Sequence, residues 1–458
     1  MAGLVSDPMI ILKPDQIQEA VEYTLRILLN CSDLEWITLK DSIAYGCSVP
    51  SNLTSVRLQI CPSSFFELGI YGTVESLPSL PLKEINGVPL LYGSLEIFQK
   101  NNVLVIGADI VASAYFLLTR YEELVSKERD RFGRFPGKKS LPYRADFIHR
   151  PIVEEYGALL RQWLKRAGLT LPVQKSRFHI TLTHDLDIPR YYKSFWSAVK
   201  VGIRACQSKA TFTEALVAIG SRLGFCKDPL NIFDTMNLLA EKLMKSRQDI
   251  EVRTIYFVMA GGTSKYDRHY TLKDSHVKRL LKKIQQQEAD IGLHASFEAG
   301  DNPDLVEQEK INLEIALARP VLKSRHHYLH LKEPRDMWGI HDAGIKDDYT
   351  MGYADCAGFR LGVCRPVPCF DPERMTCIPV VAHPLIVMDA SLSGTAYMNL
   401  GREEALAYCL GLAGQVEKHQ GELVLLWHNH FLGGPEGVFH LPLYTELLDR
   451  LGKQSVLV

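Results

Sequence analysis

The segment FHITLTHDLDIPRYY, residues 178–192, combines a strand pattern with an abrupt polar end. Its first half is apolar and β-branched, which is typical of a buried strand. The run stops at His184, Asp185 and Asp187, which are costly to bury without partners. Two carboxylates separated by one residue point to the same side of an extended chain, where they repel unless a cation or a shared proton lies between them. The segment therefore predicts a buried strand that ends at a divalent-metal site.

Short apolar strands alternate with helical stretches from residue 178 onward. Alternation of this kind predicts a parallel α/β sheet or barrel. Residues 193–226 are expected to form a helical insertion after the first strand. The further strand candidates are RTIYFVM, DIGLHAS, HHYLHL, VVAHPLIVMD and ELVLLWHNH.

The first part of the chain, residues 1–172, is predicted to be a separate α/β domain, followed by a second domain over residues 173–458. Two strong helix patterns support it: ADIVASAYFLLTRYEELVSKE opens with Asp109, and PIVEEYGALLRQWLKRAGL ends at Gly168. Between them, DRFGRFPGKKSLPYR is a loop rich in glycine, proline and basic residues. No motif reveals this domain's role, which could be to shape a cleft, recruit a partner or mediate oligomerisation.

Composition limits the classes of protein that fit. The chain has 458 residues, a hydrophobic fraction of 46% and a formal net charge of -1. There is no basic excess for a nucleic-acid partner and no apolar run of the ~20 residues that a bilayer crossing needs. The N-terminus does not resemble a secretory signal. Ten cysteines without paired spacing indicate reduced thiols, so a cytoplasmic location is expected.

Ionisable residues gather at the predicted strand ends, where α/β barrels build their active sites. Carboxylate and imidazole ligands suit zinc, and also iron, cobalt or nickel. Each motif alone has a simpler explanation: a helix N-cap or surface turn for HDLD, a core histidine for His294, a basic edge for RHHY, or satisfied histidines for WHNH. Their recurrence on four strands favours one shared site. The residues are Asp185, Asp187, His294, Arg325, His326, His327, His428 and His430.

The ordered motifs THDLD, IGLHASF, SRHHYL and LLWHNH resemble the polysaccharide deacetylase family, carbohydrate esterase family 4, also called NodB-like. The resemblance is to divergent members whose first motif reads T-H-D-x-D and which carry an extra N-terminal α/β domain. It covers roughly residues 178–431 and, more weakly, the N-terminal region. It implies an α/β fold with a deformed (β/α) barrel of about seven strands, preceded by a smaller α/β domain.

The resemblance also implies residue roles. Asp185 would be the general base and Asp187 a metal ligand, with His294 as the second ligand. The family's next ligand is a histidine four residues later, but Glu298 occupies that position here. The third ligand is therefore open between Glu298 and His327, and we favour His327.

Other positions follow from the later motifs. Arg325 matches the arginine that orients the base, and His428 matches the general acid of metal-assisted amide hydrolysis. Asp348, Arg360 and His430 are expected to contact substrate. The implied substrate is an N-acetylated sugar or cell-envelope polysaccharide precursor, with one divalent metal, zinc first, as cofactor.

Two other function classes fit the same residues. The chain could be a non-catalytic carbohydrate-binding or assembly protein that retains a deacetylase fold. It could also be another barrel metal amidohydrolase, although the H-x-H pair of that class normally lies on the first strand and here lies on the last. Metal identity, acyl group and oligomeric state stay open.

Overall fold

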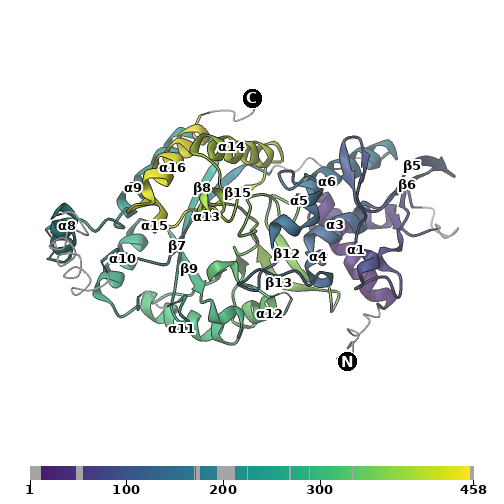
Figure 1. Ribbon diagram of the computed structural model, residues 1–458. Helices are drawn as coiled ribbons and strands as arrows, with labels where there is room; N and C mark the ends of the chain where they lie inside the picture. The colour runs from purple at the N-terminus through teal and green to yellow at the C-terminus, as the bar shows by residue number, and fades with distance from the viewer. Residues whose placement is uncertain are drawn as a thin grey trace.

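The structure is a computed structural model, and it describes residues 12–47, 55–169, 171, 176–192, 212–223, 225–267, 270–287, 289–332 and 334–453. A smaller group of N-terminal elements lies at one end of the molecule, and a larger sheet surrounded by helices lies at the other (Figure 1). Within the described ranges, no helix combines the length and the apolarity that a membrane crossing requires.

The N-terminal elements form a small α/β unit around a four-stranded sheet of order β1-β2-β6-β5. Its strands are β1 (Ile43–Tyr45), β2 (Leu58–Ile60), β5 (Gly93–Lys100) and β6 (Val103–Ala108), with a separate hairpin of β3 (Lys83–Ile85) and β4 (Val88–Leu90). Its helices are α1 (Pro14–Leu29), α2 (Asp33–Leu39), α3 (Ile110–Leu118), α4 (Tyr121–Val125), α5 (Leu141–Arg144) and α6 (Ile152–Arg166).

The long helix predicted to begin at Asp109 is wrong in length. Asp109 caps α3 as expected, because its side chain accepts a hydrogen bond from the amide of Ala112 over 2.9 Å. The chain then turns at Arg120, whose φ of 52° is left-handed, and α4 begins as a separate helix. One left-handed residue interrupts the hydrogen-bonding pattern of a right-handed helix, and the sequence shows no glycine or proline that would signal the break.

The larger sheet has nine strands in the order β12-β13-β11-β10-β9-β8-β7-β15-β14. All neighbours pair in parallel except β12 and β13, which form an antiparallel edge. The count exceeds the expected seven because it includes that edge and a two-residue strand. The strands are β7 (His179–Leu186), β8 (Glu251–Val258), β9 (Asp290–Ala295), β10 (Lys323–His326), β11 (Asp347–Asp348), β12 (Val367–Asp371), β13 (Thr376–Ala382), β14 (Leu385–Met388) and β15 (Glu422–Leu426).

The sheet curls into a partial barrel because of how β13 and β14 are joined. The predicted strand VVAHPLIVMD divides at His383 and Pro384, since proline cannot donate a ladder hydrogen bond. β13 then pairs with β11 and β14 pairs with β15, towards opposite ends of the strand series. A two-residue link between strands that pair so far apart draws the two ends of the sheet together.

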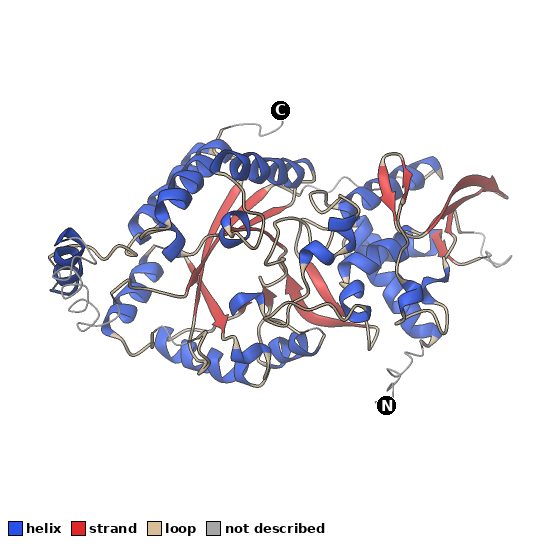
Figure 2. Cartoon of the chain, in the orientation of Figure 1, coloured by secondary structure: helices blue, strands red, loops and turns tan. Residues whose placement is uncertain are grey.

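Helices cover the outside of the curled sheet, whose strands are red in Figure 2. The predicted insertion at 193–226 is described only in part, as α8 (Phe212–Leu223), and residues 193–211 lie outside the described ranges. The remaining helices are α9 (Phe233–Ser246), α10 (Ser275–Gln286), α11 (Leu305–Leu317), α12 (Arg335–Asp342), α13 (Asp389–Ser393), α14 (Arg402–Lys418), α15 (Asn429–Leu432) and α16 (Gly437–Leu451).

One continuous apolar core joins the N-terminal elements to the larger sheet. Two hydrogen bonds also join these parts. Tyr23 donates a hydrogen bond to the carbonyl of Pro368 over 2.8 Å, and Tyr71 donates to that of Pro372 over 2.7 Å. Both carbonyls belong to or directly follow β12. The β12–β13 hairpin is therefore the part of the larger sheet on which the N-terminal helices pack.

Candidate active site

The predicted metal ligands, base, arginine and general acid lie at one edge of the sheet. His294 in β9 is paired in register with Arg325 in β10, and Thr183 in β7 is paired with Leu426 in β15. Because these strands are parallel, their carboxyl ends meet at the same edge. The structure thereby brings together residues that are as much as 243 positions apart, such as His184 and Trp427, whose backbone carbonyl accepts a hydrogen bond from the His184 ring.

Asp187, His294 and His327 form a buried cluster whose potential ligand atoms all lie within 4.8 Å of one another. Nε2 of His294 is 3.2 Å from Oδ1 of Asp187, and Nε2 of His327 is 3.8 Å from Oδ2. Two of these atoms, Oδ1 of Asp187 and Nε2 of His294, are buried without a hydrogen-bond partner within the described part of the chain. Buried polar atoms are normally satisfied, so the proximity of these two atoms fits a site that would hold a cation.

The outer nitrogens of the two rings support the same conclusion. Nδ1 of His294 donates to the carbonyl of Arg325 over 3.0 Å, and Nδ1 of His327 donates to Oδ1 of Asp267 over 3.0 Å. Histidines that bind metal usually donate their second ring N–H to a carbonyl or carboxylate, which fixes the ring and leaves the other nitrogen free to coordinate. One carboxylate and two imidazoles are a donor set that suits zinc and related ions.

Charges of neighbouring side chains shift the pKa values of Asp187 and His327 within the cluster. Burial alone would raise the pKa of Asp187, but the neighbouring charge of His327 and the contact with His294 hold it well below its usual value. Burial would lower the pKa of His327, but Asp187 and Asp267 raise it to about 9. The carboxylates of Asp187 and Asp267 therefore favour positive charge at this position.

The structure distinguishes between the two candidates for the third ligand. Oε2 of Glu298 accepts hydrogen bonds from the amide and the hydroxyl of Thr263, each over 2.8 Å, and Glu298 is not part of the cluster. β9 has ended by then, and Glu298 starts a short 3-10 helix that directs its side chain elsewhere. His327 is the residue brought to Asp187.

Asp185 is held by Arg325. Nη1 of Arg325 donates to Oδ1 of Asp185 over 3.0 Å and to the hydroxyl of Thr183 over 2.7 Å, while Nε donates to the carbonyl of Tyr349. The guanidinium is fully buried and lies 4.6 Å from the ring centroid of Phe257. Because Oδ1 is occupied, Oδ2 is the free oxygen, and it lies between two imidazoles.

His428, two residues beyond the end of β15, faces the same position. Its Nε2 is 3.9 Å from Oδ2 of Asp185 and 3.6 Å from Oδ2 of Asp187. Its Nδ1 donates to Oδ1 of Asp389 over 2.8 Å, and its backbone amide donates to Oδ2 of Asp389 over 2.6 Å. Burial would lower the pKa of His428, but the charges of Asp389 and Asp187 raise it to about 10. Asp389 therefore fixes both the ring orientation and the charge of His428.

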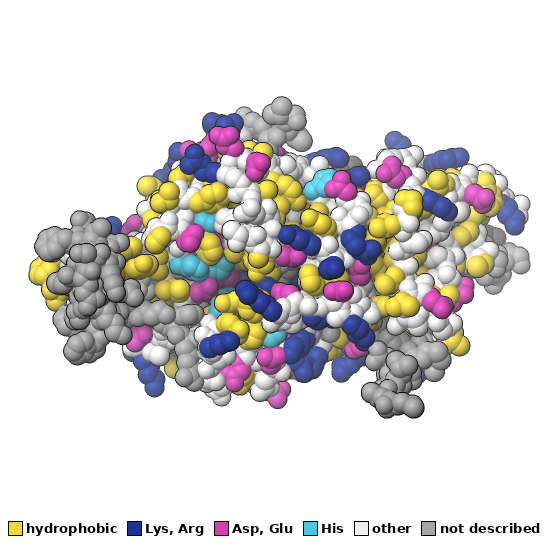
Figure 3. All heavy atoms as spheres, viewed as in Figure 1, with side chains coloured by type: hydrophobic (Ala, Val, Ile, Leu, Met, Phe, Trp, Pro, Cys, Tyr) yellow, Lys and Arg dark blue, Asp and Glu magenta, His cyan; other side chains and the backbone are white. Residues whose placement is uncertain are grey.

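A cavity of about 330 Å³ is lined by four of these groups, Asp185, Asp187, His327 and His428. Acidic and imidazole groups form part of its lining, while Tyr328, Tyr397 and Phe431 contribute aromatic walls. His430 lines it as expected, with its ring centroid 5.1 Å from that of His428. Figure 3 shows histidine and acidic side chains gathered over this part of the molecule, left of centre. Pockets of this size and mixed lining suit small ligands such as a sugar residue.

Two predicted substrate contacts are wrong. Asp348 is fully buried, and its carboxylate accepts hydrogen bonds from Ser324 and Thr350. Arg360 forms a two-pronged ion pair with Glu123 and lies against the ring of Tyr353. Neither lines the cavity. Both side chains stabilise packing because partners from other elements satisfy them, which sequence order alone does not reveal.

Four residues were missed by the sequence argument. Asp389 carried a signal, since it ends the candidate strand VVAHPLIVMD just as other acidic groups end theirs. Thr183 lies in the THDLD motif but is a common strand residue. Asp267 and Arg134 lie in loops and gave no signal, because only the fold places them beside His327 and the cavity.

Comparisons with known proteins give a distant likeness. Residues 10–169 match the model of a family of unknown function, DUF7033, and no curated protein matches the chain. Among solved structures, the chain is similar to a candidate polysaccharide deacetylase from Mycobacterium smegmatis, with 13% identity and a TM-score of 0.38 over 63% of this chain and 88% of that one.

Two further solved structures show a likeness of the same order. A candidate polysaccharide deacetylase from Pseudomonas aeruginosa PAO1 has 10% identity and a TM-score of 0.35, over 60% of this chain and 84% of that one. Puue allantoinase has 10% identity and a TM-score of 0.34, over 62% and 88%. At such values the function has to be argued from the side chains of the site.

Proposed function

We propose that this protein is a metal-dependent hydrolase that removes an acyl group, with acetyl the expected one, from the nitrogen of an N-acetylated sugar or cell-envelope polysaccharide precursor. One observation carries the proposal: a three-ligand cluster, a carboxylate held by an arginine and a histidine held by an aspartate converge on one cavity. Each of these parts has a defined use in amide hydrolysis, and a purely structural cluster would not need all three.

Asp187, His294 and His327 are the residues that would hold the metal, and zinc suits them best, with iron, cobalt or nickel sharing the same donor preferences. When bound, such an ion supplies a Lewis acid for the acetamide carbonyl. The outer hydrogen bonds to Asp267 and to the carbonyl of Arg325 keep the two rings in their binding orientation.

Asp185 is the proposed general base. The hydrogen bond from Arg325 occupies Oδ1 and leaves Oδ2 between His294 and His428, at 3.7 and 3.9 Å from their Nε2 atoms. From there Oδ2 can accept the proton of an attacking water. Arg325 pairs with this buried carboxylate and fixes its rotamer.

His428 is the proposed general acid. Its Nδ1–H donates a hydrogen bond to Asp389, so the Nε2–H points toward the carboxylates of Asp185 and Asp187. This nitrogen can donate its proton to the leaving amine as the amide bond breaks. His430 and the aromatic walls are proposed to hold the sugar ring.

The substrate is proposed to be an intracellular precursor, such as a nucleotide-linked or lipid-linked N-acetyl sugar. Every described cysteine is a free thiol, which supports the proposed cytoplasmic location. A division into domains 1–172 and 173–458 stays part of the proposal, supported by a family match that stops at residue 169.

The proposal is tested by elemental mass spectrometry of protein purified without chelators, together with Asp187→Ala and His327→Ala. We expect about one equivalent of a transition metal in the wild type and its loss in both variants, as for a site that holds three protein ligands. Acetate release from a panel of N-acetyl sugars should then depend on that metal. Wild-type protein that holds no metal after reconstitution with zinc, iron or cobalt would leave a binding protein instead.

A further inference from the structure

A loop of the N-terminal region reaches the cavity. We call residues Asp130–Lys138 the clamp loop; it lies within the segment matched by the family of unknown function. Its shape is fixed internally, because Asp130 accepts hydrogen bonds from the amides of Phe132 and Arg134, over 2.8 and 3.0 Å. The same carboxylate accepts from Nε and Nη2 of Arg134, over 2.8 and 2.6 Å. Arg134 is thus held in one rotamer and is only 9% exposed.

From this position Arg134 contacts two walls of the cavity. Its Nη1 donates to the backbone carbonyl of Tyr328 over 2.7 Å, and its Nη2 donates to the hydroxyl of Tyr397 over 3.2 Å. Lys138, at the other end of the clamp loop, donates from Nζ to the backbone carbonyl of Tyr397 over 2.7 Å. Tyr328 and Tyr397 both line the cavity, so one loop fixes the position of two of its walls.

Tyr328 follows the proposed ligand His327 directly, and its backbone is in an unusual conformation. Its φ is 61° and its ψ is 10°, and Leu329 also has a positive φ of 53°. Left-handed backbone is unfavourable for residues with a Cβ and persists where surrounding contacts hold it. β10 ends at His326, so the backbone of His327 lies directly between the strand and this turn.

The clamp loop supplies part of the contacts that hold the turn, together with the rings of Tyr266 and Phe297. Arg134 binds the Tyr328 carbonyl, and the Phe132 ring lies 5.0 Å from the Tyr328 ring, centroid to centroid. Gly133 in the clamp loop has a left-handed φ of 78°, a conformation that favours glycine. Within the turn, the amide of His330 donates to the carbonyl of His327 over 3.1 Å.

The base of the clamp loop is bound by the segment that joins β11 to β12. The amides of Gly137 and Lys138 donate to the carboxylate of Asp355 over 2.7 and 3.1 Å.

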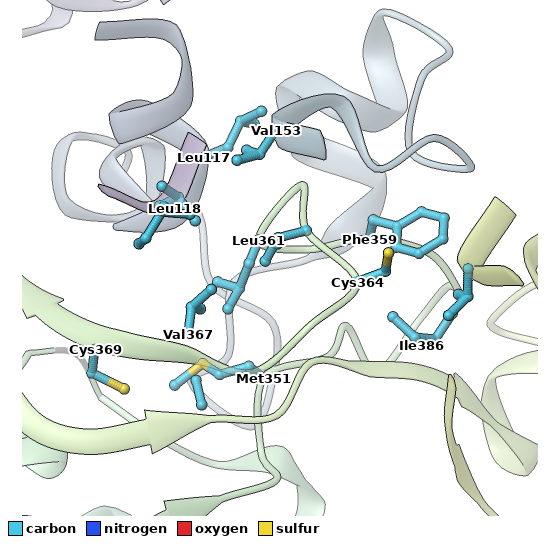
Figure 4. Packing of buried hydrophobic residues seen from close by; sticks show 14 of the residues in the cluster. Leu117, Leu118, Val153, Met351, Phe359, Leu361, Cys364, Val367, Cys369 and Ile386 are labelled. Atoms are coloured by element: carbon cyan, nitrogen blue, oxygen red, sulfur yellow. The ribbon is translucent and has the colours of Figure 1, made fainter. Parts of the chain in front are cut away.

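Figure 4 shows Leu117 and Val153 of the N-terminal helices above Leu361 of the segment that leads into β12. The next residue, Gly362, is in such close contact that a Cβ on it would lie 2.9 Å from Leu117 and 3.0 Å from Val153.

We propose that Arg134 is a positioning residue for His327, and that the N-terminal region is a structural part of the active site rather than an independent module. The inference rests on the proposed function, in which His327 binds the metal. Arg134 does not recruit an anionic substrate in this view, because Asp130 already pairs with its charge. Its role is to hold the turn at Tyr328 and the wall at Tyr397.

The test compares Arg134→Met with Arg150→Met in the full-length protein. Arg150 makes a similar two-pronged ion pair with Glu155 and also binds the carbonyl of Gly87, but it does not line the cavity. Zinc affinity is measured by competition with a chromophoric chelator. We expect zinc binding about 10-fold weaker or worse in Arg134→Met, because the turn next to His327 loses a contact, and unchanged affinity in Arg150→Met.

A metal-free readout separates this inference from the proposed function. Hydrogen exchange of the His330 amide, followed in a peptide that spans the turn, should be about tenfold faster or more in Arg134→Met than in Arg150→Met, because local opening becomes easier. Arg134→Lys, which folds with its charge retained, should show an intermediate effect on both measurements. Wild-type affinity and exchange in Arg134→Met and Arg134→Lys would overturn the inference. Wild-type protein that binds no zinc would overturn the proposed function, and the exchange rates would still decide whether Arg134 holds the turn.

Discussion

Arg325 and Asp185 lie 140 positions apart in the chain and form a fully buried ion pair, with Nη1 of the arginine 3.0 Å from Oδ1 of the aspartate. A buried charge pair stabilises a fold little compared with apolar packing, but loss of one partner leaves the other charge buried alone. The pair is therefore more informative about function than about stability. It places a carboxylate in a fixed orientation beside a cavity where a general base is needed.

Substitution of Arg325 by methionine should be strongly destabilising. Removal of one partner of a buried pair costs about 3–5 kcal/mol in unfolding free energy, and urea denaturation measures it. The matched control is Arg253→Met, because Arg253 and Glu251 form an ion pair whose side chains are 50% and 58% exposed. That pair should contribute less than about 1 kcal/mol. The double variant Arg325→Met, Asp185→Asn should recover part of the loss, and a double variant no more stable than Arg325→Met would contradict the account.

Asp389→Asn should reduce catalysis and leave metal binding intact. The asparagine can still accept a hydrogen bond from His428, but it no longer provides the charge that favours a protonated ring. We expect kcat for acetate release to fall by about 100-fold, within the range for loss of acid–base catalysis. Zinc content should remain that of the wild type.

A suitable control for Asp389→Asn is Asp371→Asn. Asp371 is also buried and accepts hydrogen bonds from the Trp338 ring and from the amides of Glu373 and Arg374, but it does not line the cavity. Its kcat should match the wild type. Equal kcat values in both variants would exclude a catalytic role for the His428–Asp389 pair.

The identity of the third ligand can be tested through its neighbours. Asp267→Asn weakens the hold on Nδ1 of His327, so zinc affinity should fall by about 10- to 100-fold. Glu298→Gln should bind zinc as the wild type does, because Glu298 is engaged with Thr263. The opposite pattern, with Glu298→Gln impaired and Asp267→Asn normal, would identify Glu298 as the ligand.

His383, a buried histidine outside the candidate site, predicts a pH dependence of stability that is independent of the metal site. His383 joins β13 to β14 and donates to Glu422 over 2.6 Å and to Asp347 over 3.2 Å. Burial would lower the pKa of His383, but these hydrogen bonds and the two carboxylate charges raise it from 6.5 to about 9. A raised pKa in the folded state adds stability that is complete below pH 6.5 and is lost as the pH rises through 9.

The measurement is the difference in unfolding free energy between wild type and His383→Gln from pH 5 to pH 10. The difference should be largest near pH 5–6 and shrink by at most about 3 kcal/mol toward pH 10. Glu422 contributes a pH dependence at acid pH. Its pKa is lowered, because the effect of His383 outweighs that of burial. The stability that ionised Glu422 adds is therefore lost as the pH falls below the usual pKa of a glutamate. A pH-independent difference would show that His383 is not charged in the folded protein.

The sequence by itself determined the alternating strands and helices, the strand that ends at Asp185 and Asp187, and the placement of His294, Arg325 and His428 at strand ends. These features depend on local periodicity and on the rule that parallel strands present their carboxyl ends at one edge. They were therefore predictable from short stretches of the chain.

Only the tertiary structure decided the contacts between distant segments. It placed Arg134 from the N-terminal region at the cavity and directed Glu298 toward Thr263. It also brought His327 close to Asp187 and made Asp389 the hydrogen-bond partner of His428. It also showed that Arg360 is occupied by Glu123, 237 positions away. The physical reason is that hydrogen bonds and ion pairs depend on distance and direction in space, and residue types carry no record of which remote partner the fold will bring within reach.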